Sequence, residues 1–356
     1  MMHSLYVVFA FCALLGACDR ATGNHLGLGE RFEDGFRMLG PLAFSMAGIL
    51  CLSPLLAVLC QSLSPILTHL NVDPSILACL LAIDMGGWQI AEKLASNSDS
   101  AYFFGILATA TLGCTLSFTI PVGISLFKEE NREFFSRGLL YGIITIPIGL
   151  FVGALCMKIP LLAAFYLCFP LILLSSLLGI ALARHPTGTA RVLQGYAVFL
   201  RFLATLGLGF AAFSHLSGII LLPGMLPLSE ALEVVCSIGI ILLGALPLSE
   251  ILLHVLSRYA GMLGHRIGLS SQGIVGLLLL FVNVTPGLAT IPAMENRAKV
   301  VAAAFSVSAA SCLTAHLAFT IRFAPQVAGA LILCKSAGSF SAVALAFLAT
   351  RNKVLE

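Results

Sequence analysis

Long runs of apolar residues, separated by short polar connections, recur along the whole sequence. A helix that crosses the hydrocarbon layer of a bilayer needs about 20 predominantly apolar residues. Only 10% of the residues are charged and the mean hydropathy is +1.03, whereas soluble domains average about a quarter charged. The sequence therefore predicts an all-α polytopic membrane protein, with residues 1–356 forming a single integral domain in the lipid bilayer.

Eleven apolar segments account for most of the chain. The first is a short helix at 5–17, which we expect to be retained because no Lys or Arg precedes it, as a signal peptide would require. Gly or Pro interrupts two others in mid-segment, at Asp84-Met85-Gly86-Gly87 and at Asn283-Val284-Thr285-Pro286-Gly287. The ten later segments are 36–59, 75–90, 101–127, 138–157, 161–183, 192–216, 232–255, 272–294, 300–321 and 327–348.

The distribution of Lys and Arg indicates how these segments cross the membrane. If all eleven cross, the connecting positive charges divide 8 against 9, which gives no orientation under the positive-inside rule. If the two interrupted segments instead enter and leave on one side, as re-entrant hairpins, only Lys93, Lys158 and Arg322 lie outside. The larger group is then cytoplasmic: Arg20, Arg31, Arg37, Lys128, Arg132, Arg137, Arg184, Arg191, Arg258, Arg266, Arg297, Lys299, Arg351 and Lys353. We therefore expect about nine crossing helices plus two re-entrant segments.

An internal similarity points to the same topology. The stretch GILCLSPLLAVL…LNVDPSILACLLAIDMGG weakly matches GIILLGALPLSEILLHVL…IGLSSQGIVGLLLLFVNVTPG, in the same order. In the hairpin topology the two copies have opposite orientations, which predicts inverted repeats at 1–160 and 192–356 joined by a helix at 161–183. Inverted repeats with paired broken helices are a recurring secondary-transporter architecture. Chance similarity between two Leu-rich stretches is the alternative.

Asp84 narrows the function most, because a carboxylate deep in an apolar segment is costly unless it is paired, hydrated or part of a transport path. Gly86 and Gly87 allow the backbone beside it to unwind, and the carbonyls released there favour positive charge. Trp88, the only tryptophan, can cover a cation with its ring face. We therefore expect these residues to bind a small cation.

A buried salt bridge from Asp84 to Arg201 or Lys335 is the structural alternative, although a cationic ligand could also displace such a bridge. Arg201 and Lys335 lie inside apolar segments and are expected to balance buried acids rather than to bind substrate. Glu250 lies nearer a helix end, where its carboxylate can reach the membrane surface.

The second interruption contributes neutral polar groups. Asn283 and Thr285 suit a hydroxyl or an amine better than an anion. His316, in the apolar run LTAHLAF, could relay protons, accept a hydrogen bond or simply pack. The expected substrate-binding residues are thus Asp84, Gly86, Gly87, Trp88, Asn283, Thr285 and His316.

Other function classes lack the residues they need. The scattered positive charges, with no interleaved aromatics, disfavour nucleic-acid binding. There is no second deeply buried acid for an aspartyl protease, no G-x-S-x-G serine and no H-E-x-x-H pair. The cysteines form no C-x-x-C pair and suit packing. We therefore expect a transporter and not an enzyme, without a metal or cofactor; a homo-oligomer is compatible with this prediction.

Several short motifs carry a family resemblance that runs in order through nearly the whole chain. They are Asp19-Arg20, RFEDGFRMLG at 31–40, AIDMGG at 82–87, TIPIG at 145–149 and MENRAKV at 294–300, with His316 and Lys335 following. The sequence resembles the ethanolamine-utilization permease family. It departs from that family at Val284, where the family tends to have a second Asn, and at Ala315, where the family tends to have an Asp before the histidine.

This resemblance implies a permease that admits ethanolamine across the bacterial inner membrane for catabolism. Ethanolamine is small and cationic and carries one hydroxyl, which matches one buried carboxylate and one neutral polar patch. Two alternatives remain at this point. An ion-coupled symporter of another small amine or amino acid would respond differently to competition by glycine or alanine. A membrane-embedded enzyme acting on lipid headgroups would yield a chemically altered product.

Overall fold

The structure is a computed structural model that describes residues 2–81, 87–127 and 132–351. These residues form helices, and no strand occurs among them, which confirms the predicted all-α class. They divide into two compact units, each assembled from three separate stretches of the chain. The first unit contains Met1–Ile106, Val198–Leu252 and Leu313–Ala328, and the second contains Leu107–Ala197, Leu253–Cys312 and Gly329–Glu356.

Seven helical stretches among the described residues are long and apolar enough to cross a bilayer, judged by length and composition. Each corresponds to one of the eleven segments expected from the sequence. The exact number of crossings, the re-entrant hairpins and the inverted repeat remain predictions. The seven stretches are Leu28–Gln61, Ser98–Leu126, Arg132–Cys156, Leu161–Arg184, Pro186–Ser217, Leu228–Ser257 and Pro325–Thr350.

The first unit contains mainly short N-terminal helices together with parts of two long ones. Its core includes a cluster in which α4, α6 and α7 bury Cys60, Ala78, Ile90 and Leu94 together. The helices of this unit are α1 (Met2–Ala21), α2 (Leu28–Arg37), α3 (Leu39–Leu42), η1 (Ala43–Ala47), α4 (Gly48–Gln61), α5 (Ser64–His69), α6 (Ile76–Leu81), α7 (Trp88–Leu94), α8 (Ser98–Tyr102), most of α13 (Leu228–Ser257), the later part of α12 (Pro186–Ser217), α18 (Ala315–Phe323) and η6 (Pro325–Val327).

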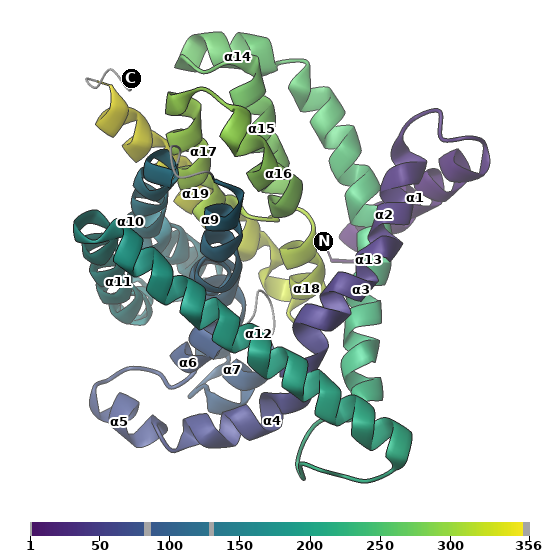
Figure 1. Cartoon of the computed structure of the whole chain (residues 1–356), viewed down its shortest axis with the longest axis vertical. Coiled ribbons are helices and arrows are strands. Elements are labelled where there is room, and N and C mark those ends of the chain that lie inside the picture. The colour runs from purple at the N-terminus through teal and green to yellow at the C-terminus, as the bar shows by residue number, and fades with distance from the viewer. Residues whose placement is uncertain (1, 82–86, 128–131, 352–356) are drawn as a thin grey trace. The chain divides into compact units, whose positions relative to one another are not determined.

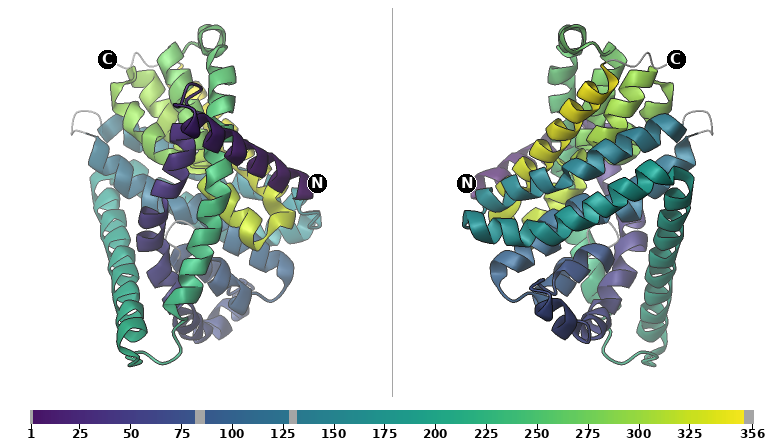
Figure 2. Two further views of the ribbon diagram at one scale, coloured as in Figure 1. Left: turned by 90° about the vertical axis from the view of Figure 1, so that its right-hand side faces the viewer. Right: turned by 90° about the vertical axis from the view of Figure 1, so that its left-hand side faces the viewer.

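Within this unit, α1 crosses α13 at close range (Figure 2). The crossing is possible because Gly244 brings the backbone of α13 against the backbone of Phe9. The turn after α1 is fixed by Asp19, whose buried carboxylate accepts hydrogen bonds from the backbone N–H groups of Leu26, Leu28 and Gly29, each at 2.9 Å. Asp19 of the family motif therefore has a structural role.

The second unit contains three long helices, α10, α11 and α19, and several shorter C-terminal helices. In it, α15 packs against both α14 and α17, and the four helices α14 to α17 lie next to one another (Figure 1). The helices of this unit are η3 (Thr115–Thr119), α9 (Ile120–Leu126), α10 (Arg132–Cys156), α11 (Leu161–Arg184), the first part of α12, α14 (Ala260–Ile267), α15 (Ser271–Val282), α16 (Val284–Thr290), η5 (Ile291–Ala293), α17 (Asn296–Ala309) and α19 (Ala328–Thr350). A π-helix, η2 (Phe103–Gly113), passes from the first unit into the second.

The core of the second unit is built around α10. Figure 2 shows α10 and α11 side by side. Gly138 and Gly142 bring α10 against the backbone of α17, and Gly149 and Gly153 bring it against α19. Each of these two glycine pairs has the G-x-x-x-G spacing. This spacing lets apolar helices approach closely in lipid, where van der Waals packing is the main attraction.

One expected crossing segment, 300–321, is not a continuous helix. The structure divides it into α17, which ends at Ala309, and α18, which begins at Ala315. Residues 310–314 between them contain Ser311 with φ +49°, in the left-handed region that ends a right-handed helix. The break was not predicted, because no Gly or Pro marks it in the sequence.

Candidate functional site

The second interruption lies in the second unit and is shorter than expected: only Asn283 is non-helical, because Val284–Thr290 form α16. Asn283 separates α15 from α16 with extended backbone angles, φ −142° and ψ 116°. Its side-chain Oδ1 accepts a hydrogen bond from the N–H of Thr285 at 3.2 Å and so caps α16. Pro286 then lies in the first turn of α16, where its missing N–H costs little. Asn283 is half-buried and Thr285 is exposed, so both can reach a ligand.

The break at 310–314 lies directly against this interruption. The N–H of Ser311 donates to the carbonyl oxygen of Leu280 at 3.2 Å. The hydroxyl of Ser311 accepts the N–H of Val284 at 3.1 Å, in a buried position. The interruption at Asn283 and the break that contains Ser311 are therefore held together by hydrogen bonds within the second unit.

Replacing Ser311 with alanine is expected to lower the free energy of unfolding by about 1–3 kcal/mol. The substitution leaves the buried N–H of Val284 without its acceptor, and an unmatched buried donor carries the full cost of its lost hydration. The measurement is thermal unfolding of the full-length protein in detergent. The matched control is Ser306→Ala, because the hydroxyl of Ser306 is buried but bonds only to Ala303 in its own helix. Equal melting temperatures for the two variants would contradict the prediction.

The first interruption is described only on its C-terminal side, in the first unit. Asp84 and Gly86 lie outside the described residues. Gly87 is buried, and its carbonyl oxygen accepts the N–H of Ala91 at 2.9 Å, so that Gly87 starts α7. The indole of Trp88 is 8% exposed and stacks on Tyr102, with ring centroids 5.3 Å apart and planes 10° from parallel. Tyr102 therefore covers one face of the ring, so a cation would lie against the opposite face.

A polar group that the sequence analysis did not single out lies next to Trp88. The Oε1 atom of Gln89 is buried, and no donor among the described residues reaches it. An amide oxygen in such a position is a suitable acceptor for an ammonium or hydroxyl group. Its position directly after the Gly-Gly-Trp sequence is the signal that could have identified it.

His316 lies in the first turn of α18, in the first unit, and its side chain is 1% exposed. The hydroxyl of Tyr6 on α1 donates to the carbonyl oxygen of Ile321 at 2.9 Å, which anchors the other end of α18. The break at 310–314 is what places the imidazole at the start of a short helix.

The expected site residues are thus distributed over both units. Gly87, Trp88 and His316 belong to the first unit, and Asn283 and Thr285 belong to the second. Within the second unit, Asn283 and Thr285 are brought together by the α16 cap.

The charged residues inside apolar segments have different surroundings. Arg201 is exposed. Lys335 is fully buried in the second unit, and its Nζ donates to the carbonyl oxygen of Ala110 at 2.5 Å. Glu250 was expected to extend toward the membrane surface. In the structure its Oε2 atom forms an ion pair with Nε of Arg31, at 2.8 Å, within the first unit. Among the described residues, no group of three or more His, Cys, Asp or Glu side chains could hold a metal ion.

Comparison with known proteins gives a consistent result along the whole chain. A family model described as "Ethanolamine utilisation protein, EutH" matches residues 2–349. The "Probable ethanolamine permease EutH" of Listeria monocytogenes serotype 1/2a (strain 10403S) is 35% identical over 346 residues, covering 96% of this chain and 92% of that protein. The protein of the same description from Escherichia coli (strain K12) is 31% identical over 348 residues, covering 90% of this chain and 85% of that protein.

An "Uncharacterized protein YxeR" of Bacillus subtilis (strain 168) is also 35% identical over 348 residues, covering 96% of this chain and 93% of that protein. No solved structure is significantly similar to the chain.

Proposed function

Since this chain belongs to the EutH family of ethanolamine utilisation proteins, we propose that it imports ethanolamine across the bacterial inner membrane for catabolism. It is a multi-pass protein of that membrane. The observation that carries the proposal is the similarity, over nearly the whole chain, to relatives named as probable ethanolamine permeases. The sequence adds an acid, Asp84, within an interrupted apolar segment, which suits a small cation.

In the proposed site, Asp84 pairs with the ammonium group of ethanolamine. The cation lies against the face of the Trp88 ring opposite Tyr102, beside the backbone at Gly86 and Gly87. A carboxylate in a low-dielectric region attracts one ammonium group strongly. The free-energy cost of burying the carboxylate charge is offset by that pairing.

The hydroxyl of the substrate is assigned to the second interruption. The Oδ1 atom of Asn283 is already engaged by Thr285 N–H, so the Nδ2 donor of Asn283 and the Thr285 hydroxyl are the groups proposed to bind it. His316 would accept a hydrogen bond or pass a proton. Alternating access would come from one repeat rocking against the other.

Counterflow in proteoliposomes tests the proposed substrate. Vesicles that contain the full-length protein are loaded with unlabelled ethanolamine and diluted into a trace of radiolabelled ethanolamine. We expect transient accumulation of label above that of protein-free vesicles, and little competition by glycine or alanine, because the proposed site offers no cationic partner for a carboxylate. Absence of accumulation would contradict the proposed function.

The same vesicles distinguish the alternatives. Accumulation that requires a sodium or proton gradient would identify a coupled symporter, whereas accumulation without a gradient identifies a facilitator. Strong competition by glycine or alanine would indicate that the substrate is an amino acid and not ethanolamine. Mass spectrometry of the vesicle contents should detect unaltered ethanolamine, and a modified product would instead indicate an enzyme.

A further inference from the structure

The second unit contains a pocket of about 800 Å³ whose described lining includes none of the residues proposed to bind ethanolamine. It lies among the ends of four helices, α9 to α12, all within one continuous part of the unit. The residues that line it are Ile124, Arg132, Glu133, Phe135, Ser136, Arg137, Leu140, Leu182, Ala183, Pro186, Thr187, Ala190, Arg191 and Gln194.

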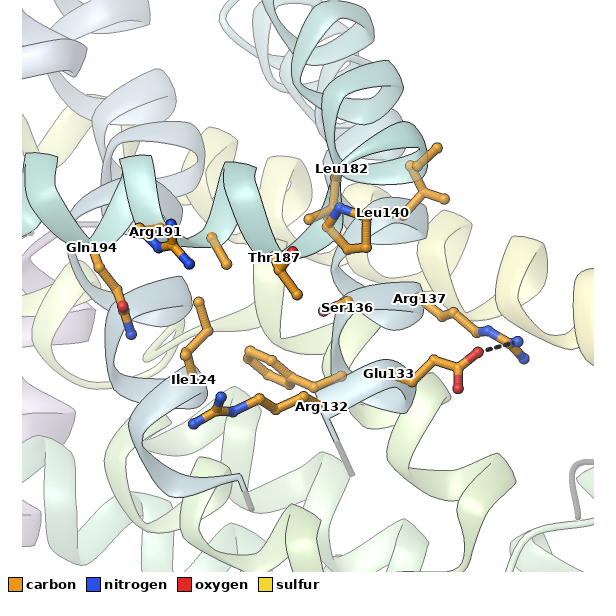
Figure 3. Close-up of a pocket in the computed structure, with 14 residues that line it drawn as sticks. Ile124, Arg132, Glu133, Ser136, Arg137, Leu140, Leu182, Thr187, Arg191 and Gln194 are labelled. Atoms are coloured by element: carbon orange, nitrogen blue, oxygen red, sulfur yellow. Dashed lines mark hydrogen bonds and ion pairs between the residues drawn. The ribbon is translucent and has the colours of Figure 1, made fainter. Parts of the chain in front are cut away.

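The described lining of this pocket is basic. Three arginines, Arg132, Arg137 and Arg191, accompany one acid, Glu133. Glu133 is paired with Arg137, and Figure 3 shows that pair on one side of the pocket, with Arg132 and Arg191 on the other. The guanidinium of Arg132 is oriented by a hydrogen bond from its Nε to the carbonyl oxygen of Phe127 at 3.3 Å. The described lining residues therefore carry a net positive charge.

The hydroxyls and the amide in the lining add neutral donors. Ser136 on α10 and Thr187 on α12 flank the space, and Gln194 extends from the same helix as Arg191 (Figure 3). Guanidinium groups bind phosphate oxygens in bidentate fashion, and hydroxyl and amide donors complete such a shell. The donor set fits a phosphate group better than a carboxylate, which has fewer acceptor oxygens.

The position of the pocket points to a lipid as the source of that phosphate. Arg132 begins α10, α11 ends at Arg184 and α12 begins at Pro186, so the pocket lies where candidate membrane spans end. The distribution of Lys and Arg predicts that these arginines lie on the cytoplasmic side, where basic pockets between transmembrane helices bind anionic headgroups.

Apolar side chains around the pocket provide room for acyl chains. Leu140 and Leu182 form part of its wall. On the same helices, α11 and α12, Leu177 is 56% exposed, Ile180 is 53% exposed and Val192 is 72% exposed, as expected for residues that face lipid. We propose that this pocket binds the phosphate of an anionic glycerophospholipid from the cytoplasmic leaflet.

The test compares lipid binding to purified full-length protein by native mass spectrometry, with phosphatidylglycerol and phosphatidylcholine as probes. Wild-type protein is expected to retain phosphatidylglycerol in preference to phosphatidylcholine. The double variant Arg132→Gln/Arg191→Gln should weaken phosphatidylglycerol binding at least about tenfold, because it removes two charge-assisted donors. The single variant Arg191→Gln, at an exposed position, should show an intermediate loss.

The matched control is Arg184→Gln/Arg258→Gln, which removes the same charge from two exposed residues of the second unit that do not line the pocket. This control should bind phosphatidylglycerol like the wild type. Equal loss in both double variants, or wild-type binding by Arg132→Gln/Arg191→Gln, would overturn the proposal. Displacement of the lipid by equimolar inorganic phosphate or glycerol phosphate would also overturn it, in favour of a soluble phosphate.

Discussion

Replacing Asp84 with asparagine is expected to reduce ethanolamine uptake into proteoliposomes by about thirtyfold or more. Asparagine has nearly the same size but no charge, so the ammonium of the substrate would enter an apolar region without its partner. Removing one partner of a buried, hydrogen-bonded charge pair typically costs about 2–5 kcal/mol, and each 1.4 kcal/mol is about tenfold in affinity. The measurement is the initial rate of labelled ethanolamine uptake at low substrate concentration.

The matched control is Asp99→Asn, the same chemical change at an exposed aspartate of the first unit. This variant should transport like the wild type. Melting temperature and elution volume, measured for both variants, separate a loss of binding from a loss of folding. Wild-type uptake by a folded Asp84→Asn protein would exclude the ion pair with the ammonium, while leaving ethanolamine itself as substrate.

A second substitution with a large expected effect on the free energy of unfolding is Gly142→Leu, at the contact between α10 and α17. A Cβ atom added at Gly142 would lie 2.6 Å from the carbonyl oxygen of Ala304, a backbone atom that cannot rotate away, and it would also overlap the side chain of Val307. Overpacking in a close-packed core typically costs about 1–3 kcal/mol, and more where the backbone must move. Gly142→Leu should therefore cost about 3 kcal/mol or more in unfolding free energy.

Fluorescence-detected size-exclusion chromatography and thermal melting of the purified protein measure this effect. We expect most of the Gly142→Leu protein to aggregate and any folded fraction to melt well below the wild type. Gly195→Leu is the control, since a Cβ at Gly195 in α12 meets nothing within 4 Å. A Gly142→Leu protein as stable as the control would show that α10 and α17 do not approach as closely as the structure has them.

Much of the architecture could be predicted from local sequence. Long apolar segments require helices in a bilayer, because no water is present to satisfy backbone groups. Hence the all-α class was predicted correctly. The helix boundary at Asn283 was also predictable, because an Asn that caps and a Pro three residues later end one helix and begin another through contacts within a few residues.

The break at 310–314 illustrates what local sequence does not contain. Its backbone is fixed by hydrogen bonds from Ser311 to Leu280 and from Val284 to Ser311, across about thirty residues of chain, and Ser-Ala-Ala-Ser is compatible with an uninterrupted helix. Glu250 is a similar case, because its partner Arg31 comes from a distant part of the chain. The stacking of Trp88 on Tyr102 likewise depends on how α7 packs against α8.

The sequence alone thus determined the membrane class, the family and the break at Asn283, because hydropathy, length and capping act over short distances. Only the tertiary structure decided that α17 stops at Ala309, that Glu250 meets Arg31 and that basic residues from α10 and α12 surround one pocket. The physical reason is that packing selects among backbone states whose local energies differ by little. Contacts between residues far apart in the chain supply the difference.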